Sequence, residues 1–182
     1  NTDGQAALEV LRSVGGSLSG RKAVILGAGG AARAIAYYLS KTAQNISVLN
    51  RTRSKGSAMA TEITRRGGAK CRSSMLNTTN LRREAGQADL LINTLPVDVF
   101  PRFGATLIQK GLVRPEMIVF DANYNPKSDF LANAERAGAK VADGLDMLVG
   151  QAALSFKLWT GRDAPVGVMR AAAIEARGAR AT

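Results

Sequence analysis

The chain has 182 residues, 46% of them hydrophobic and 5% aromatic, so it is long enough to bury a core as one domain without disulfide or metal cross-links. Cys71 is the only cysteine and histidine is absent, which excludes an intramolecular disulfide, a cysteine-based metal cluster, and serine–histidine or histidine–metal chemistry within the chain. The formal net charge is +11, but the basic residues lie in short, scattered groups. We therefore expect most of them on solvated faces, and no nucleic-acid partner.

The composition predicts a soluble protein of the cytoplasm, or of the plastid in a plant. No apolar run approaches the roughly 18 residues that suggest a membrane span, so no membrane partner is expected. No signal-peptide pattern precedes the first amphipathic stretch. Because the first residue is Asn1 rather than Met, we also expect the chain to be part of a longer protein. No metal site is expected.

Short apolar runs alternate with helical patterns, which is typical of a parallel sheet with helices on both faces. We expect helices at about 5–15, 31–39, 54–66, 78–86, 127–137, 145–160 and 165–178. We expect strands at about 23–26, 46–49, 69–72, 88–92, 117–120 and 140–142, with an irregular loop at 96–104. This pattern predicts an α/β fold, a doubly wound parallel sheet of six strands in the order 3-2-1-4-5-6, with flanking N- and C-terminal helices.

A glycine-rich turn joins the first of these strands to a helix. Residues 27–32 (GAGGAA) fit G-x-G-x-x-A: the first glycine allows the tight turn, the second lets the backbone approach a pyrophosphate, and Ala32 permits close helix–strand contact. The phosphates would lie at the N-terminus of the 31–39 helix, where free N–H groups and the helix dipole favour an anion. We therefore expect a Rossmann-type dinucleotide site whose residues include Gly27, Ala28, Gly29, Gly30 and Ala31.

The end of the second strand favours NADP over NAD as the cofactor. NAD-binding folds usually place an acid there to bond the ribose 2′-hydroxyl, whereas this chain has Asn50. Arg51 and Arg53 follow, and guanidinium groups can hold a 2′-phosphate by charge-assisted hydrogen bonds. Thr52 adds a hydroxyl. A surface loop that is rich in arginine by chance is the alternative.

Four segments together resemble the shikimate and quinate dehydrogenase family, in its C-terminal NADP-binding domain. They are residues 1–4 (NTDG), 27–32 (GAGGAA), 50–53 (NRTR) and 143–152 (DGLDMLVGQA), and they span nearly the whole chain. Residues 121–126 (DANYNP) are also similar to the family's D-x-x-Y-x-P. The two middle segments occur in many NADP enzymes, so the first and last carry most of the resemblance.

The resemblance implies an oxidoreductase of aromatic amino-acid biosynthesis, the chorismate pathway, that reversibly reduces 3-dehydroshikimate to shikimate with NADPH. It assigns a catalytic role to Asp3, paired with a lysine upstream of Asn1 in an N-terminal substrate domain that this chain lacks. Residues 1–182 would form the NADP-binding domain, with helices in 1–18 and about 145–182 packing towards the absent domain. From the residues alone, the N-cap of the first helix would be the favoured interpretation of Asp3, and the resemblance reverses that balance.

The resemblance also places residues at the substrate and at the nicotinamide. Asn1, Asp3, Tyr124 and Gln151 match substrate-side positions. The cofactor-side positions are Asn93, Thr94 and Leu95 at the end of the fourth strand, and Gly144, Met147 and Leu148. Core packing is an equal alternative for Leu148. Residues 93–98 (NTLPVD) lack the glycine and methionine that the family often carries there, which leaves the choice between shikimate and quinate open.

Three other functions stay open on the sequence. The chain could belong to a quinate/shikimate dehydrogenase, or be a non-catalytic NADP-binding module. The nucleotide domain of glutamyl-tRNA reductases is the third, although residues 143–152 resemble the shikimate branch more closely. The sequence also leaves the oligomeric state open, a homodimer included.

Overall fold

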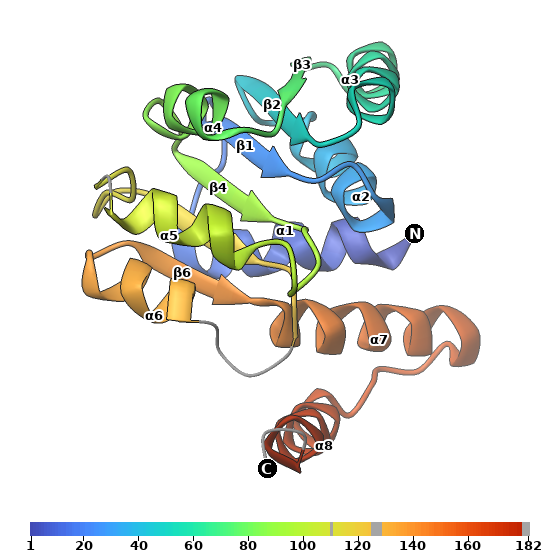
Figure 1. Cartoon of the computed structure of the whole chain (residues 1–182). Helices are drawn as coiled ribbons and strands as arrows, with labels where there is room; N and C mark the ends of the chain where they lie inside the picture. Colours follow the sequence, from blue (N-terminus) through green and yellow to red (C-terminus); the bar gives the residue numbers. More distant parts are fainter. Residues whose placement is uncertain (110, 125–128, 180–182) are drawn as a thin grey trace.

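The computed structural model describes residues 1–109, 111–124 and 129–179, in which six parallel strands form one sheet (Figure 1). The strands are β1 (Lys22–Leu26), β2 (Asn45–Asn50), β3 (Lys70–Met75), β4 (Leu90–Asn93), β5 (Ile118–Asp121) and β6 (Lys140–Asp143). Their order across the sheet is β3-β2-β1-β4-β5-β6, which confirms the predicted arrangement. The strand order reverses beside β1, which pairs with β2 on one side and β4 on the other.

Helices cover both faces of the sheet. They are α1 (Thr2–Gly15), α2 (Gly30–Leu39), α3 (Arg53–Gly67), α4 (Thr78–Ala85), α5 (Pro101–Gln109), α6 (Asp129–Arg136), α7 (Gly144–Thr160) and α8 (Val166–Ala179). Helices α1, α2 and α3 bury one face with Ala23 and Ile25 of β1, whereas α4, α5 and α6 bury the other with Val24 and Leu26. Successive side chains of a strand point to opposite faces, so the unbroken apolar run of β1 serves both cores.

The prediction of an irregular loop at 96–104 is wrong, because α5 begins inside this range. Pro101 is the first residue of α5, where the missing N–H would have had no helical partner. Phe103 and Leu107 are four residues apart, so they share one face of the helix, and both are buried. Gly104 packs so closely on Phe100 that an added Cβ would lie 3.1 Å from its ring. A glycine and a proline therefore concealed a helix that tertiary packing stabilises.

The first helix begins at Thr2 rather than near residue 5, and its N-cap is Asn1. The Asn1 side chain accepts a hydrogen bond from the Asp3 N–H at 3.1 Å. The interpretation of Asp3 as the N-cap is therefore wrong. Asp3 instead stands in the first turn, where a negative charge interacts favourably with the helix dipole.

The third strand is longer than expected, and a helix is shorter. Strand β3 pairs with β2 from Lys70 to Met75, although residues 72–74 are polar, because one side of this edge strand is partly exposed. The helix expected at 127–137 is α6, which is described from Asp129 to Arg136; residues 127 and 128 lie outside the described part of the chain.

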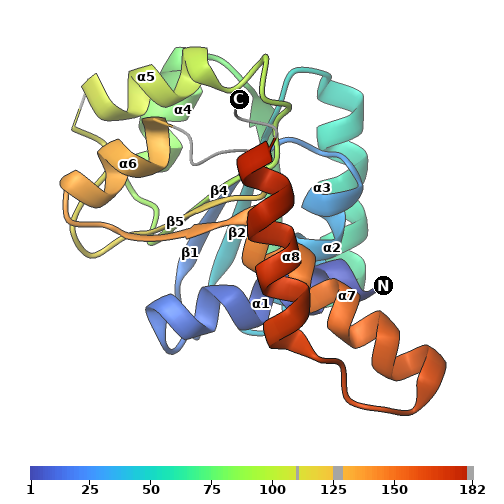
Figure 2. The same ribbon diagram turned by 90° about the horizontal axis from the view of Figure 1, so that it is seen from below.

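Helix α8 lies against α7 (Figure 2). None of its described side chains is buried. Two ion pairs join it to the first residues of α7 and the strand before it: Arg170 Nε lies 3.0 Å from Asp146 Oδ1, and Arg177 Nη1 lies 2.7 Å from Asp143 Oδ2. Across residues 1–109, 111–124 and 129–179, no helix combines the length and apolarity needed to cross a bilayer.

Candidate functional site

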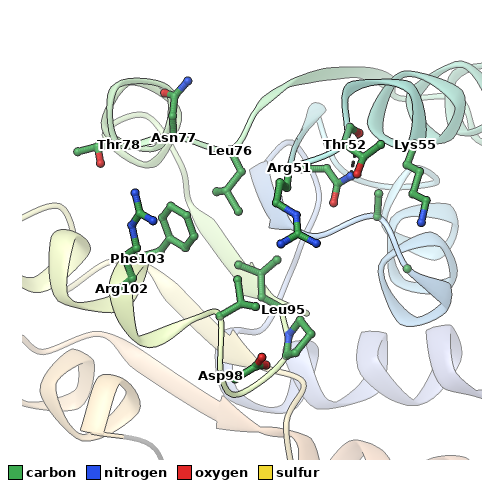
Figure 3. A pocket seen from close by; sticks show the side chains of 15 residues that line it. Arg51, Thr52, Lys55, Leu76, Asn77, Thr78, Leu95, Asp98, Arg102 and Phe103 are labelled. Carbon is green, nitrogen blue, oxygen red and sulfur yellow. Dashed lines mark hydrogen bonds between the residues drawn. The ribbon is translucent and has the colours of Figure 1, made fainter.

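A cavity of about 710 Å³ opens where β1, β2, β3 and β4 end (Figure 3). Parallel strands present all their carboxyl ends at one edge, which is where open α/β sheets bind ligands, beside the reversal of strand order. The cavity is lined by Ala28, Gly29, Asn50, Arg51, Thr52, Lys55, Leu76, Asn77, Thr78, Leu95, Pro96, Asp98, Val99, Arg102 and Phe103.

The glycine turn forms one wall. Gly27 has φ +110°, a conformation that side chains rarely adopt. Gly29 is the N-cap of α2 and has no side chain that could accept a hydrogen bond. The N–H groups of the first helical turn therefore face outwards without a side-chain acceptor. A Cβ at Gly29 or Gly30 would meet no protein atom within 4 Å. Ala32, on the inner side, is fully buried. The turn therefore leaves its outer side free for an anion.

The end of β2 supplies positive charge to the cavity. Arg51, Thr52 and Lys55 line it, and Figure 3 shows the Arg51 guanidinium pointing into it. Asn50 donates from its side-chain amide to the Thr52 carbonyl at 2.9 Å and so shapes this loop. Arg53, which the sequence paired with Arg51, is exposed and does not line the cavity. Lys55 takes its place. It stands three residues after the N-cap Thr52, which also lines the cavity, and since residues three apart are neighbours on a helix, a helical spacing argument could have found it.

Helices α4 and α5 form the opposite wall, which the sequence did not predict. Asn77 follows β3 and caps α4, its Oδ1 accepting from the Asn80 N–H at 2.8 Å. Arg102 and Phe103 come from the first turn of α5 and lie across the cavity from Arg51 (Figure 3). The sequence does not point to these two residues, because it predicts a loop at 96–104 where α5 begins. Asn77 could have been found, since it stands at the carboxyl end of a strand.

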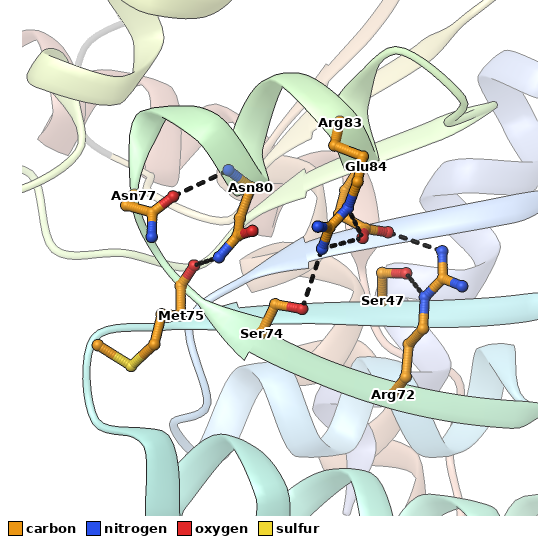
Figure 4. Close-up of polar contacts among 8 residues, drawn as sticks. All are labelled: Ser47, Arg72, Ser74, Met75, Asn77, Asn80, Arg83 and Glu84. Atoms are coloured by element: carbon orange, nitrogen blue, oxygen red, sulfur yellow. Dashed lines mark hydrogen bonds and ion pairs between the residues drawn. The ribbon is translucent and has the colours of Figure 1, made fainter.

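A buried carboxylate holds the α4 wall against the sheet (Figure 4). Glu84 of α4 has a side chain only 5% exposed, and its two oxygens lie 2.8 Å from Arg72 Nη2 and 3.0 Å from Arg83 Nη2. Arg72 also donates from Nε to the Ser47 hydroxyl of β2 at 2.9 Å. Burial alone would raise the pKa of Glu84, but hydrogen bonds from Ser47, Arg72 and Arg83 and the charge of Arg72 lower it below its ordinary value. Charged Glu84 thus joins α4 to β2 and β3.

The residues that end β4 face inwards, apart from Leu95. Asn93 is 1% exposed, and its side-chain amide donates to Asp121 Oδ1 at 2.9 Å. Thr94 donates from Oγ1 to the Leu26 carbonyl at 2.7 Å. Leu95 lines the cavity. The structure therefore places the polar groups of Asn93 and Thr94 behind the cavity wall, and of the three proposed contacts only Leu95 is positioned to touch a ligand there.

The remaining candidates lie along β5, α7 and α1, outside the cavity. Tyr124 is 47% exposed, Gln151 is half-buried, and Met147 belongs to the core. Gly144 starts α7 so close to the Ala122 carbonyl that no side chain would fit. Leu148 is half-buried.

Asp3 and the exposed Asn1 lie at the start of α1, which packs along α7. A hydrogen bond of 3.2 Å between the hydroxyls of Thr2 and Ser155 joins these two helices. The two candidates therefore stand beside α7 rather than beside the cavity.

Two family models match the chain: shikimate / quinate 5-dehydrogenase over residues 9–97, and the shikimate 5'-dehydrogenase C-terminal domain over residues 144–174. A relative from Moorella thermoacetica named shikimate dehydrogenase (NADP(+)) is 42% identical over 181 residues, which are 98% of this chain and 61% of the relative.

Solved structures agree. A shikimate 5-dehydrogenase from Listeria monocytogenes, in complex with shikimate and NAD, has a TM-score of 0.82 and 30% identity, over 93% of this chain and 61% of that one. A shikimate dehydrogenase in complex with NADP+ has a TM-score of 0.81 and 34% identity, over 96% and 61%. The chain thus spans about three fifths of the length of these relatives. These matches confirm the resemblance drawn from the sequence: the chain belongs to the shikimate/quinate dehydrogenase family.

Proposed function

We propose that this chain is the nucleotide-binding part of a cytoplasmic, NADP-dependent shikimate dehydrogenase, which reversibly reduces 3-dehydroshikimate to shikimate in aromatic amino-acid biosynthesis. One observation carries the proposal: in a chain of this family, a single cavity joins a helix N-terminus without a side-chain cap to the cations Arg51 and Lys55. The relative from Moorella thermoacetica is named for this NADP-dependent activity.

The cavity suits an adenosine that carries both a diphosphate and a 2′-phosphate. A diphosphate would rest on the first turn of α2, where N–H groups and the helix dipole attract an anion. Arg51 and Lys55 would hold the 2′-phosphate, with the Thr52 hydroxyl as a further donor. Leu76 and Phe103 offer an apolar surface for the adenine.

The preference for NADP rests on the charge of the loop after β2. Of the two solved relatives described above, one is in complex with NAD and the other with NADP+, so the family alone does not decide the cofactor. Asn50 stands where an acid would accept from a free 2′-hydroxyl and repel a 2′-phosphate. In the described structure no carboxylate forms an ion pair with Arg51 or Lys55, whereas Arg33 nearby is paired with Glu62 at 2.8 Å. The two cations at the β2 side of the cavity are therefore available for a phosphate.

Reduction of a ketone needs a hydride on carbon and a proton on oxygen. NADPH, when bound, supplies the hydride. We assign the proton to a lysine of the rest of the protein, on the strength of the family resemblance, with Asp3 accepting a hydrogen bond from it and orienting it. Asp3 is half-buried in the first turn of α1, at the sheet edge that α7 also borders. Tyr124 and Gln151 would contact the substrate.

The substrate domain would dock on α7 and α8. Leu158, Trp159 and Val168 are 76%, 85% and 69% exposed, which is unusual for large apolar side chains gathered on neighbouring helices. The relatives are longer than this chain, so their additional residues can supply the surface that covers these side chains. A homodimer is compatible with this arrangement, and light scattering of the whole protein would decide the oligomeric state.

The proposal is tested by oxidation of shikimate with NADP, using the whole protein that contains this chain. Asp3→Asn should lower kcat by about 100-fold or more, because general acid–base catalysis contributes on that order. Glu9→Gln is the matched control, since Glu9 is an exposed carboxylate of the same helix. Turnover of quinate instead of shikimate would reassign the substrate. NADP binding without turnover of either would leave a non-catalytic module.

A further inference from the structure

At the ends of β4 and β5, three N–H donors of the described residues meet at one buried carboxylate. Asp121 is 3% exposed. Its Oδ1 accepts from the Asn93 side-chain amide at 2.9 Å, from the Asn123 backbone at 3.1 Å and from the Asn123 side-chain amide at 2.7 Å. A buried carboxylate is stable only where donors compensate for lost water, and these donors are neutral amides. The three side chains therefore have one mutually satisfied arrangement.

The two asparagines extend this network into two loops and the start of a helix. Asn93 Oδ1 accepts from the Leu95 N–H at 3.0 Å, and the Asn123 side-chain amide donates to the Leu95 carbonyl at 3.1 Å. The Asn123 carbonyl accepts from the Gly144 N–H at 3.2 Å. The loop after β4, the loop after β5 and the start of α7 are thus fixed relative to one another through Asp121.

We propose that Asp121, Asn93 and Asn123 are positioning residues that set the place of the nicotinamide half of the dinucleotide against the substrate. The inference rests on the proposed function. The adenosine half occupies the β2 side of the sheet, so the other half must cross β1 and lie over the ends of β4, β5 and β6. The loops that the network joins are the ones that carry Leu95, Tyr124 and Gly144 along this path.

Asp at position 121 matters because a carboxylate only accepts hydrogen bonds. An asparagine there would keep the shape but offer the three donors on Oδ1 a neutral oxygen, to which hydrogen bonds are weaker than to a carboxylate. The loops would then be held less firmly. A displacement of about 1 Å at a reacting centre can cost about 100-fold in rate, whereas the distant adenosine site would stay intact.

The test uses the whole protein with Asp121→Asn and Asn123→Ala, and measures kcat for shikimate oxidation together with the Kd of adenosine 2′,5′-bisphosphate. This probe carries the adenosine half and the 2′-phosphate but no nicotinamide. Asp89→Asn is the matched control, because Asp89 accepts from the Lys22 N–H at 2.8 Å at the opposite end of the sheet. The double variant Asn93→Asp, Asp121→Asn exchanges the amide and the carboxylate and restores a satisfied pair.

We expect kcat to fall at least about tenfold in both single variants while the Kd of the bisphosphate stays within about twofold of wild type. The exchange variant should recover most of the loss, and Asp89→Asn should keep the wild-type kcat. An unchanged kcat in both single variants, or an equal loss of bisphosphate binding, would overturn the inference and leave the proposed function standing. A wild-type protein that binds the bisphosphate without oxidising shikimate would instead refute the proposed function, and the inference with it.

Discussion

The side chain of Thr94 occupies the space beside Gly27 that any larger residue would need. Thr94 donates from Oγ1 to the Leu26 carbonyl at 2.7 Å, and a Cβ built at Gly27 would clash with that same oxygen. The end of β4 thus fixes the shape of the phosphate-binding turn after β1. Gly29, two residues later, meets no protein atom on its open side.

This contrast predicts different effects for two glycine-to-alanine substitutions. Gly27→Ala should lower the free energy of unfolding by about 1–3 kcal/mol, because it combines a strained φ with a clash. Gly29→Ala should change it by less than about 0.5 kcal/mol, since its backbone is extended and exposed. NADP titrations should nevertheless show at least about tenfold weaker binding for Gly29→Ala, whose methyl group would stand where the diphosphate approaches. Unaltered affinity would place the phosphates elsewhere.

The cations of the cavity predict a second contrast. Arg51→Ala and Lys55→Ala should each raise the Kd of NADP about tenfold or more, because a charge-assisted hydrogen bond contributes about 1.5–3 kcal/mol. The Kd of NAD should change by less than about threefold, since NAD lacks the 2′-phosphate. Arg53→Ala is the control, as Arg53 lies outside the cavity. If Arg53→Ala weakened NADP binding as much as Arg51→Ala, the assignment of these side chains would be wrong.

The strand order and the glycine turn could be predicted from the sequence because both depend on local patterns. Residues 23–26 form an unbroken apolar run, which is typical of a strand buried on both faces. Residues 27–32 have the glycine spacing that the backbone geometry of the turn requires. Arg51 was found because it follows a strand directly. In each case the information lies within a few neighbouring residues.

The rest depended on contacts between distant residues. Gly104 and Pro101 argue against a helix locally, and only the packing of Phe103 and Leu107 on the sheet shows that α5 forms. Arg102 was therefore missed as a wall of the cavity. Likewise, Asn93 looks like a ligand contact in the sequence, but its partner Asp121 lies 28 residues away and holds it inside.

The Glu84 network predicts a stability that depends on pH. The pKa of Glu84 is lowered in the folded protein, so its contribution is present above the ordinary glutamate pKa and is lost as the pH falls through the folded value. Glu84→Gln should cost about 1–2 kcal/mol near neutral pH, discounted because Arg72 and Arg83 are 58% and 57% exposed. Urea unfolding of wild type and variant should converge as the pH falls well below the ordinary glutamate range. The substitution Glu9→Gln, at an exposed site, should show no such dependence. A difference in unfolding free energy between wild type and Glu84→Gln that stayed constant at all pH values would contradict the ion pairs.

Cys71 should be unreactive in the folded protein. Burial raises its pKa to about 12, so at pH 8 only about one thiol in ten thousand is ionised, against about a quarter for a free cysteine. A thiol-specific disulfide reagent should therefore react slowly with the native protein and completely in urea. Rapid modification of the native protein would show that β3 and α3 open readily around this side chain.

The affinity of the wild-type protein for NADP relative to NAD tests the account most directly. Both cofactors share the diphosphate and the adenine, so their difference isolates the 2′-phosphate and the charges of Arg51 and Lys55. We predict that NADP binds at least about tenfold more tightly at moderate ionic strength. Equal affinities, or tighter binding of NAD, would contradict the assignment of this cavity to a 2′-phosphorylated nucleotide.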